Sequence, residues 1–358
     1  MTGVVTRDAE RSSATAEGAR GPRGSHGPGH VYIIAEMACS HEGDPRLART
    51  IIDGAGQAGA DAIQFQIWSL ADMVVPHHPE YRQLAGLELS QDDWTDLASY
   101  VHDRYPAMRI IACVYERKSA DFCDRIGVDA YKIHSADLSN PSLIRHVART
   151  GKRIDLSIGA TTLDEIKVAL RWIRAVSSSP IWLLYGFQNF PTQPEDLHLR
   201  YLRHLKQRFG LPVGYQDHSD AETGAAFWLP AAAVGIGIDI LEKHLTHDRS
   251  RNGIDHEAAL NPDEFARFVG MVREIEAAKG QAAPKPFSPA ELRYRRYAKK
   301  SLVASRPLGA GTRLTEADLL CMRADQLGLP PDQGDRLIGR VTKRKIEAYH
   351  VIREEDVG

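Results

Sequence analysis

Two segments of the chain each end in a histidine that follows a short apolar run. Residues 213–218 read Val-Gly-Tyr-Gln-Asp-His, and residues 240–244 read Ile-Leu-Glu-Lys-His. A polar residue at the last inward position of a core strand is unfavourable, whereas the C-terminal end of a parallel α/β barrel is where such residues do chemistry. Two neutral imidazoles that converge there could hold a divalent metal. His218 and His244 are therefore predicted to be metal ligands.

The parity of these two strands separates their polar side chains into two groups. Side chains alternate between the two faces of a strand, so Glu242 points inward with His244, while Lys243 faces the helices. Asp217 has the opposite parity to His218. We therefore interpret Asp217 as structural, or as a residue that orients the site residues from behind.

The elements that must position these residues follow a repeating pattern of short apolar runs and helical segments. Eight strand-then-helix units in roughly 250 residues favour a (β/α)8 TIM barrel over an open doubly wound sheet. An open sheet would also need a glycine-rich phosphate turn after its first strand, and residues 39–43, Cys-Ser-His-Glu-Gly, are not one. The predicted strands are 31–37, 61–67, 109–114, 128–134, 153–157, 180–186, 212–217 and 238–244.

Several of the intervening helices have clear start signals. A capping side chain followed by proline at the first helical position occurs at Asp44-Pro45, Asn140-Pro141 and Asn261-Pro262. Thr162 and Glu165 have the spacing of a capping box. These signals place four helix starts directly after predicted strand ends or loops.

Composition points to a soluble cytoplasmic protein that acts on small molecules. The 358 residues are 43% hydrophobic and carry 45 basic against 47 acidic side chains, so no nucleic-acid surface is indicated. No apolar run is long enough to cross a membrane. The four cysteines are far apart and form no CxxC motif, which argues against a disulfide framework or zinc knuckle and for a reducing compartment.

Changes in composition divide the chain into four parts. Residues 1–30, rich in Gly, Ser, Ala and Arg without an apolar core, are predicted to be a disordered leader. The barrel is predicted over 31–285, a linker over 286–298 and a compact tail over 299–358. About sixty residues make a marginal core alone, so the tail is expected to lean on something larger.

A set of short motifs occurs in one order from residue 31 onward. The motifs are Ile33-Ile-Ala-Glu36, His41-Glu-Gly43, Ala58-Gly-Ala-Asp61, Phe65-Gln66, Tyr131-Lys-Ile133, Ser135, Gly214-Tyr-Gln-Asp-His218, Leu241-Glu-Lys-His244 and Asn261-Pro262. No single motif is specific, but their common order and spacing is. In these motifs the chain resembles the sialic acid (N-acetylneuraminate) synthase family, whose members condense phosphoenolpyruvate with an N-acyl hexosamine. The resemblance implies a TIM barrel followed by a small β-rich domain called antifreeze-like or SAF.

The resemblance implies roles for the residues at the barrel mouth. His218 and His244 would hold manganese or magnesium, which polarises the acceptor aldehyde. Glu36 would transfer protons, and Lys132 would bind phosphoenolpyruvate. A buried lysine needs an anionic partner, so a carboxylate such as Glu36 or an anionic ligand must lie beside it. For Glu242 two readings stay open: a direct catalytic role, or a hydrogen bond that orients His244.

Further positions are expected to contact the two substrates. Hydroxyls of Ser135 and Ser157 would bind the donor's phosphate and carboxylate, and an amide of Gln188 or Asn189 would contact the donor. The SAF-domain arginine would reach the acceptor's N-acyl group. The predicted substrate-binding residues are Gln64, Gln66, Cys113, Ser135, Asp137, Ser157, Gln188, Asn189, Gln216, Asp255 (for acceptor hydroxyls) and Arg323.

The chain departs from the family pattern in both halves of the pocket. Gln64 stands where the family has a lysine, Cys113 replaces a threonine, and Tyr185-Gly186 replaces His-Cys. The predicted function is metal-dependent condensation of phosphoenolpyruvate with an N-acylhexosamine-like aldehyde. Two alternatives remain: a metal-dependent aldolase with a less anionic donor, and a non-catalytic sugar-binding relative. The predicted active unit is a homodimer in which the C-terminal domains are exchanged.

Overall fold

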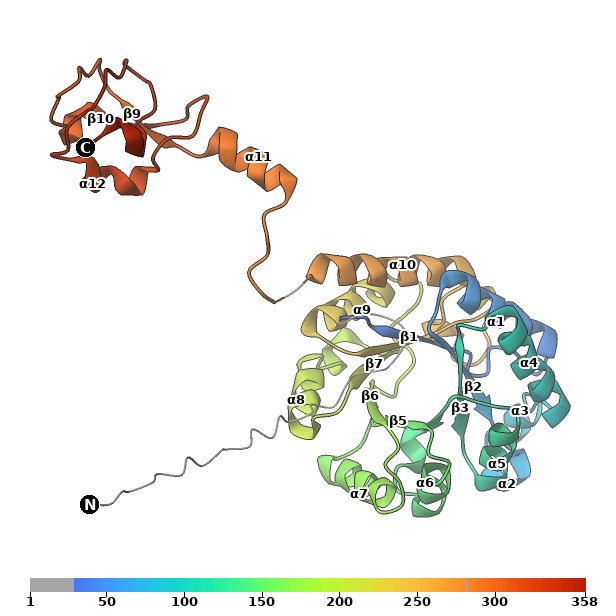
Figure 1. The fold of residues 1–358 in the computed structure, drawn as a ribbon. Helices are drawn as coiled ribbons and strands as arrows, with labels where there is room; N and C mark the ends of the chain where they lie inside the picture. The colour runs from blue at the N-terminus through green and yellow to red at the C-terminus, as the bar shows by residue number, and fades with distance from the viewer. Residues whose placement is uncertain (1–28, 281) are drawn as a thin grey trace, which may run out of the picture. The chain divides into compact units, whose positions relative to one another are not determined.

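Eight parallel strands form a closed barrel at the centre of the first unit of the chain (Figure 1). The computed structural model describes residues 29–280 and 282–358. Each strand pairs with the next, and β8 pairs with β1, so this sheet has no free edge. The strands are β1 (Tyr32–Glu36), β2 (Ala62–Ile67), β3 (Arg109–Val114), β4 (Ala130–Ile133), β5 (Arg153–Ser157), β6 (Ile181–Tyr185), β7 (Val213–Asp217) and β8 (Ile240–His244).

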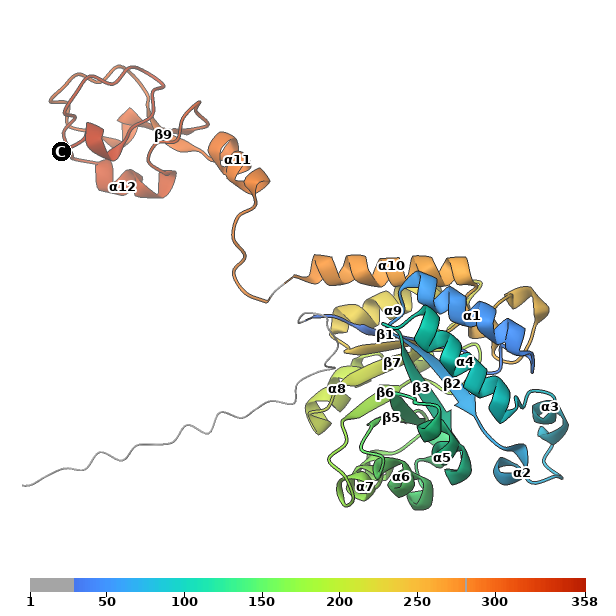
Figure 2. The same cartoon turned by 45° about the vertical axis from the view of Figure 1, so that its right-hand side comes forward.

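Helices surround the barrel on its outside (Figure 1). In Figure 2, α10, α1 and α4 lie side by side on the outer surface. The helices of this unit are α1 (Pro45–Ala58), α2 (Leu70–Met73), α3 (Tyr81–Ala85), α4 (Gln91–Arg104), α5 (Arg117–Arg125), α6 (Pro141–Ala148), α7 (Leu163–Arg174), α8 (Arg200–Phe209), α9 (Ala225–Ile236) and α10 (Pro262–Lys279). Short 3-10 turns are η1 (Ser135–Asp137), η2 (Pro194–Asp196), η3 (Arg249–Arg251) and η4 (His256–Ala258).

The barrel prediction is confirmed strand by strand, because every predicted run contains one observed strand. The local start signals act as expected. Asp44 caps α1 by accepting a hydrogen bond from the backbone of Arg46, and Asn140 caps α6. Thr162 and Glu165 form the predicted capping box of α7.

The barrel interior is closed at its N-terminal end by a packed apolar and aromatic layer. Arg153 crosses this layer, with its guanidinium carbon 3.6 Å from the ring centre of Trp182 and its Nε 2.8 Å from Asp155 Oδ1. Because the ion pair and the rings fill this end, access for substrates is left to the C-terminal end. The layer consists of Tyr32, Ile34, Ala62, Ile111, Ala130, Trp182, Leu184 and Ile240.

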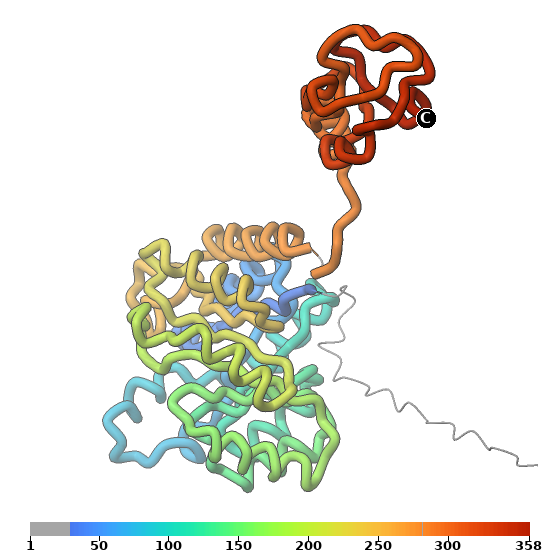
Figure 3. The backbone as a smooth tube through the Cα atoms, turned by 90° about the vertical axis from the view of Figure 1, so that its left-hand side faces the viewer, coloured from blue at the N-terminus to red at the C-terminus, as the bar shows by residue number. Residues whose placement is uncertain are grey.

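The second unit, Gln281–Gly358, has a small core of its own. Its strands β9 (Ser301–Ala304) and β10 (Leu319–Met322) pair antiparallel, and the remaining chain winds around them in short turns (Figure 3, orange to red). Its helices are α11 (Pro289–Ala298) and α12 (Gly334–Leu337), with turns η5 (Glu316–Asp318), η6 (Pro331–Gln333) and η7 (Glu354–Asp356). The core consists of Leu302, Ala304, Leu308, Leu314, Leu337, Ile346, Ile352 and Val357.

The structure can be compared with the predictions for the linker, the leader and membrane-spanning segments. The predicted linker 286–298 contains helix α11. The predicted leader lies outside the described residues except for Gly29 and His30. Across the described part of the chain, no helix has the length and apolarity needed to cross a membrane.

Candidate active site

The outward faces of β7 and β8 are joined by a buried ion pair. Asp217 and Lys243 are register partners, and Lys243 Nζ lies 2.5 Å from Asp217 Oδ2 with neither side chain exposed. The hydroxyls of Tyr215 and Ser219 also donate to the Asp217 carboxylate, at 2.7 and 2.8 Å. These contacts support the interpretation of Asp217 as structural, and they show that Lys243 lies on the same side of the sheet as Asp217. This pair fixes the register of the two strands that carry the histidines.

The inward faces of the same strands bring the predicted metal ligands together. The rings of His218 and His244 have centres 5.2 Å apart and are nearly perpendicular, at 75°. His218 Nδ1 hydrogen-bonds the carbonyl oxygen of Phe187 at 2.9 Å, which leaves its Nε2 lone pair available. Burial lowers the pKa of both imidazoles, so both are neutral near pH 7, the state in which histidine binds a metal.

One aromatic residue at this pair was missed by the sequence reasoning. The ring centre of Phe190 lies 4.3 Å from that of His218 and 5.6 Å from that of His244. Phe190 belongs to the segment after β6 that was singled out for its amides. An aromatic residue in a loop does not by itself indicate a contact with the histidines. The position of this loop is set only when the whole barrel has formed.

Lys132 joins two carboxylates across the barrel interior. Its ammonium Nζ is 2.7 Å from Glu242 Oε1 and 3.4 Å from Glu36 Oε2, and all three side chains are buried. Burial alone would lower the pKa of Lys132, but the charges of Glu242 and Glu36 outweigh it and raise the pKa. The prediction of a carboxylate beside Lys132 is confirmed, with Glu242 as the nearer partner.

A second chain of hydrogen bonds reaches the same carboxylate from β5. Ser157 Oγ donates to Gln216 Oε1 at 2.9 Å, and Gln216 Nε2 donates to Glu242 Oε1 at 2.9 Å. Glu242 therefore bonds Gln216 and Lys132, and its second oxygen, Oε2, is buried with no partner among the described residues. No hydrogen bond between Glu242 and His244 is found in the described part of the chain.

Glu36, the last residue of β1, has a strongly perturbed carboxyl group. Its Oε1 accepts from the backbone of Ala38 at 2.7 Å and from Gln66 Nε2 at 3.4 Å. Burial raises the pKa of Glu36 to about 7, with Glu242 adding to the effect and Lys132 opposing it. Gln66 is oriented in turn by the hydroxyl of Tyr115 at 2.9 Å, a residue that the sequence reasoning did not include. A carboxyl that titrates near neutrality can give and take protons.

Two departures from the family pattern lie beside these groups. Gln64 is the register partner of Glu36 and is completely buried, yet neither its amide oxygen nor its nitrogen has a hydrogen-bond partner among the described residues. Cys113 is the register partner of both Gln66 and Lys132. Burial raises the pKa of the Cys113 thiol to about 12, so it is uncharged at neutral pH.

The remaining residues that were predicted to bind the donor, with their neighbours, lie in the loops after β4 and β6. Ser135 opens η1, and Asp137 accepts a hydrogen bond from Asn140 Nδ2 at 2.9 Å, which holds its carboxylate at the start of α6. A side-chain carbon on Gly159 would lie 2.6 Å from Gln188 Nε2, so the Gln188 amide packs on the backbone just beyond β5. Asn189 is exposed. Of the two predicted amides, Gln188 is the one that packs against Gly159, just beyond the end of β5.

Two further residues were predicted to contact the acceptor. Asp255 lies on the loop after β8 with a left-handed backbone, φ 63°, and burial raises its pKa to about 6. Arg323 belongs to the second unit, where it is exposed directly after β10. Its contact with a substrate stays a prediction.

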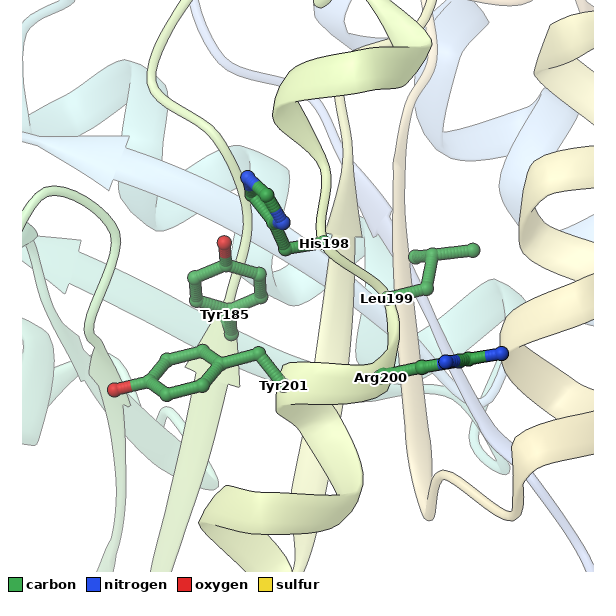
Figure 4. A pocket seen from close by; sticks show the side chains of 5 residues that line it. All are labelled: Tyr185, His198, Leu199, Arg200 and Tyr201. Carbon is green, nitrogen blue, oxygen red and sulfur yellow. The ribbon is translucent and has the colours of Figure 1, made fainter.

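A separate pocket lies on the outer side of β6, next to the start of α8 (Figure 4). The rings of Tyr185 and Tyr201 meet edge to face there, with centres 5.2 Å apart, and the Tyr185 hydroxyl points toward His198. Tyr185 alternates with the inward-facing Leu184 along β6. None of the predicted site residues lines this pocket, so it is not part of the candidate site.

The protein groups at the mouth fit a metal that takes only two of its ligands from side chains. Within the described residues, no group of three or more His, Cys, Asp or Glu side chains has the arrangement to hold an ion. His218 and His244 are nevertheless paired, neutral and buried, and His244 Nδ1 has no partner in the described part of the chain. The remaining ligands of such an ion would be water or substrate oxygens.

Comparisons with known proteins agree with this architecture. A model of the NeuB family matches residues 51–284, and a model of the SAF domain matches residues 299–358. The chain is 31% identical to the N,N'-diacetyllegionaminic acid synthase of Legionella pneumophila, covering 89% of this chain and 91% of that protein. It is 29% identical to the N-acetylneuraminate-9-phosphate synthase of Mus musculus, covering 91% and 92%.

A solved structure gives the same result. The N-acetylneuraminic acid synthetase of Leptospira borgpetersenii is 30% identical, with a TM-score of 0.67 over 74% of this chain and 91% of that one. Fold and comparisons together define a TIM-barrel enzyme, and its candidate site residues lie at the C-terminal ends of β1, β4, β7 and β8. The chain belongs to the NeuB family, and it is an enzyme of the sialic acid synthase type with a C-terminal SAF domain.

Proposed function

We propose that this protein catalyses the divalent-metal-dependent condensation of phosphoenolpyruvate with an N-acylhexosamine-like aldehyde, giving a 2-keto-3-deoxy sugar acid such as a nonulosonic acid and releasing phosphate. The observation that carries this proposal is the convergence of the Lys132 cluster and the neutral pair His218 and His244 at one end of the barrel. The first provides a site for an anion, and the second provides a site for a cation that can act on a carbonyl.

Bond changes follow from the chemistry of the two substrates. C3 of the enolpyruvate donor bonds to the aldehyde carbon, and the aldehyde oxygen becomes a hydroxyl by taking a proton. One water adds its oxygen to C2, and the bond between C2 and the phosphate oxygen then breaks. The products are the 2-keto acid and inorganic phosphate.

Donor binding is assigned to the β4 and β5 side of the mouth. The Lys132 ammonium and the hydroxyls of Ser135 and Ser157 are suited to an anionic phosphate and carboxylate. Gln188 packs beside the end of β5 and adds an amide to the same region. Glu36, whose pKa is raised to about 7, is the group that exchanges protons with the reacting oxygens.

Acceptor binding is assigned to the β7 and β8 side of the mouth. His218 and His244 would hold manganese or magnesium, both of which accept mixed nitrogen and oxygen ligation. Such an ion supplies Lewis-acid polarisation of the acceptor carbonyl. Asp255 would hydrogen-bond acceptor hydroxyls, and Phe190 would cover the histidine pair and limit the entry of water.

The experiment that tests this function follows phosphate release and product mass. Purified full-length protein is incubated with manganese, phosphoenolpyruvate and a panel of N-acylated sugar aldehydes. We expect phosphate release only with an aldehyde present, and a product heavier than the acceptor by the pyruvate unit. Turnover of a non-phosphorylated keto donor, without phosphate release, would instead favour an aldolase.

We further propose that the active unit is a cytoplasmic homodimer in which the SAF domain of each subunit closes the barrel of its partner. The second unit by itself supports this, because it leaves several apolar side chains exposed, including Leu320 (37%), Met322 (41%) and Leu327 (52%). No residue of α11 is buried either. Exposed apolar groups of this kind mark surfaces that contact other protein.

Complementation between two inactive chains tests this dimer. A His218→Ala chain and an Arg323→Ala chain are mixed under conditions in which mass measurements verify subunit exchange. We expect partial recovery of activity, because one mouth of the mixed dimer combines an intact histidine pair with an intact arginine. No recovery after verified exchange rules out closure by the partner's domain.

A further inference from the structure

The anion-binding groups of the mouth are already occupied by other side chains of the protein. Lys132 Nζ contacts Glu242 Oε1 at 2.7 Å, within the range of a strong charge-assisted hydrogen bond. Ser157 directs its only proton to Gln216 Oε1. Gln216 donates to the same Glu242 oxygen that accepts from Lys132. The free protein therefore holds both donor-binding groups in one network that ends on a single carboxylate.

An anionic donor cannot simply be added to this network. Glu242 and Glu36 both flank Lys132 in an interior from which water is largely excluded. A phosphate or carboxylate placed at Lys132 would lie against the nearer carboxylate, and like charges repel strongly in such a medium. A donor that uses Lys132 must therefore take the position of the Glu242 carboxylate.

The geometry points to Glu242 as an internal counter-ion, which neutralises Lys132 until the donor binds and by this competition limits the affinity for the donor. This inference rests on the proposed function, since it requires an anionic donor at Lys132. It assigns Glu242 a role other than the two predicted from the sequence. Its partners are Lys132 and Gln216, whereas no bond to His244 is found among the described residues.

Incomplete bonding of Glu242 makes a clean test possible. Its Oε2 is buried without a partner in the described part of the chain. No hydrogen bond is therefore broken when that oxygen is replaced by an amide nitrogen. Glu242→Gln keeps the shape of the side chain and an oxygen that can accept from Gln216, but removes the negative charge. Damage to packing weakens ligand binding, whereas loss of a competitor strengthens it. The sign of the change therefore separates the two effects.

The experiment measures binding of inorganic phosphate and of phosphoenolpyruvate by calorimetry. It uses chelator-treated full-length protein at low salt. Removing a competing charged hydrogen bond should tighten binding by about 10-fold to about 100-fold in Glu242→Gln. The matched control is Glu222→Gln, which makes the same net charge change at a side chain that is 79% exposed. We expect its affinity to equal that of the unmodified protein.

Each outcome decides between the possibilities. Unchanged or weaker binding in Glu242→Gln overturns the counter-ion role, while the proposed function stands if the unmodified protein still binds and uses phosphoenolpyruvate. If the unmodified protein binds neither anion, the proposed donor is wrong and the inference falls with it. Should the variant not fold, a crystal structure of the unmodified protein with donor bound decides. The separation of Lys132 from Glu242 must then exceed hydrogen-bond distance, and a retained contact refutes the exchange.

Discussion

Replacing Glu36 with glutamine should make the protein more stable above neutral pH while removing its activity. Glu36 is 1% exposed, and burial raises its pKa from the ordinary value of 4.5 to about 7. The unfolded chain therefore loses this proton at lower pH than the folded chain does. Between pH 4.5 and pH 7 the folded state binds more protons, so the contribution of Glu36 to stability falls as the pH rises.

The size of this effect follows from the shift. Each pK unit corresponds to about 1.36 kcal/mol, so the ionised Glu36 lowers the free energy of unfolding by about 3 kcal/mol above pH 8. Glu36→Gln carries no titrating group at this position. The difference in unfolding free energy between variant and wild type should therefore grow by about 2–3 kcal/mol between pH 5 and pH 8, in favour of the variant. Activity should fall by about 10²–10⁴-fold, as expected for the loss of a proton-transfer group.

Urea unfolding of chelator-treated protein at a series of pH values measures this difference. Tryptophan fluorescence reports on the barrel unit, because all five tryptophans lie between residues 68 and 228. Glu222→Gln is the control, and its stability should follow the wild type at every pH. A difference for Glu36→Gln that is constant with pH would show that burial does not perturb this carboxyl, and the assignment of Glu36 as the proton-transfer group would lose its physical basis.

Substitutions at four further positions test other parts of the site. Gln64→Lys should lower the apparent KM for phosphoenolpyruvate by about 10-fold or more at low salt, and by less at high salt. An unchanged KM would count against an anionic donor. His218→Ala or His244→Ala should weaken manganese binding, followed by electron paramagnetic resonance, with an unchanged circular dichroism spectrum; retained affinity in both would contradict the metal site. Asp217→Ala leaves Lys243 buried without its carboxylate and should cost about 3–5 kcal/mol of unfolding free energy; a loss below about 1 kcal/mol would show that the pair does not hold β7 to β8.

Local signals in the sequence were enough to predict the barrel and the direction of most site residues. Strands β1 to β8 lie within the predicted runs because alternation and apolar runs are properties of neighbouring residues. Parity along β8 correctly turned Glu242 inward and Lys243 outward. Parity along β7 did the same for His218 and Asp217. These predictions needed no knowledge of tertiary contacts.

Contacts across the barrel could not be predicted in this way. Lys132 and Glu242 are separated by 110 positions in the chain, and which carboxylate lies nearer depends on the tilt and stagger of the strands. The sequence therefore predicted the pairing of Lys132 with Glu36, which the structure contains, but not the nearer partner Glu242. The same limit applies to Phe190 at the histidine pair and to Tyr115 on Gln66.

The distribution of charge inside the barrel explains how the site combines stability with reactivity. At the N-terminal end, Arg153 and Asp155 satisfy each other and are covered by Trp182, so this pair has no capacity left for a ligand. At the C-terminal end, Lys132 is shared by two carboxylates, and one oxygen of Glu242 remains unpaired within the described residues. A buried charge with incomplete compensation raises the energy of the free protein. A cation near the carboxylates would offset this excess negative charge, whereas an anion at Lys132 would have to displace Glu242, which is the competition proposed above.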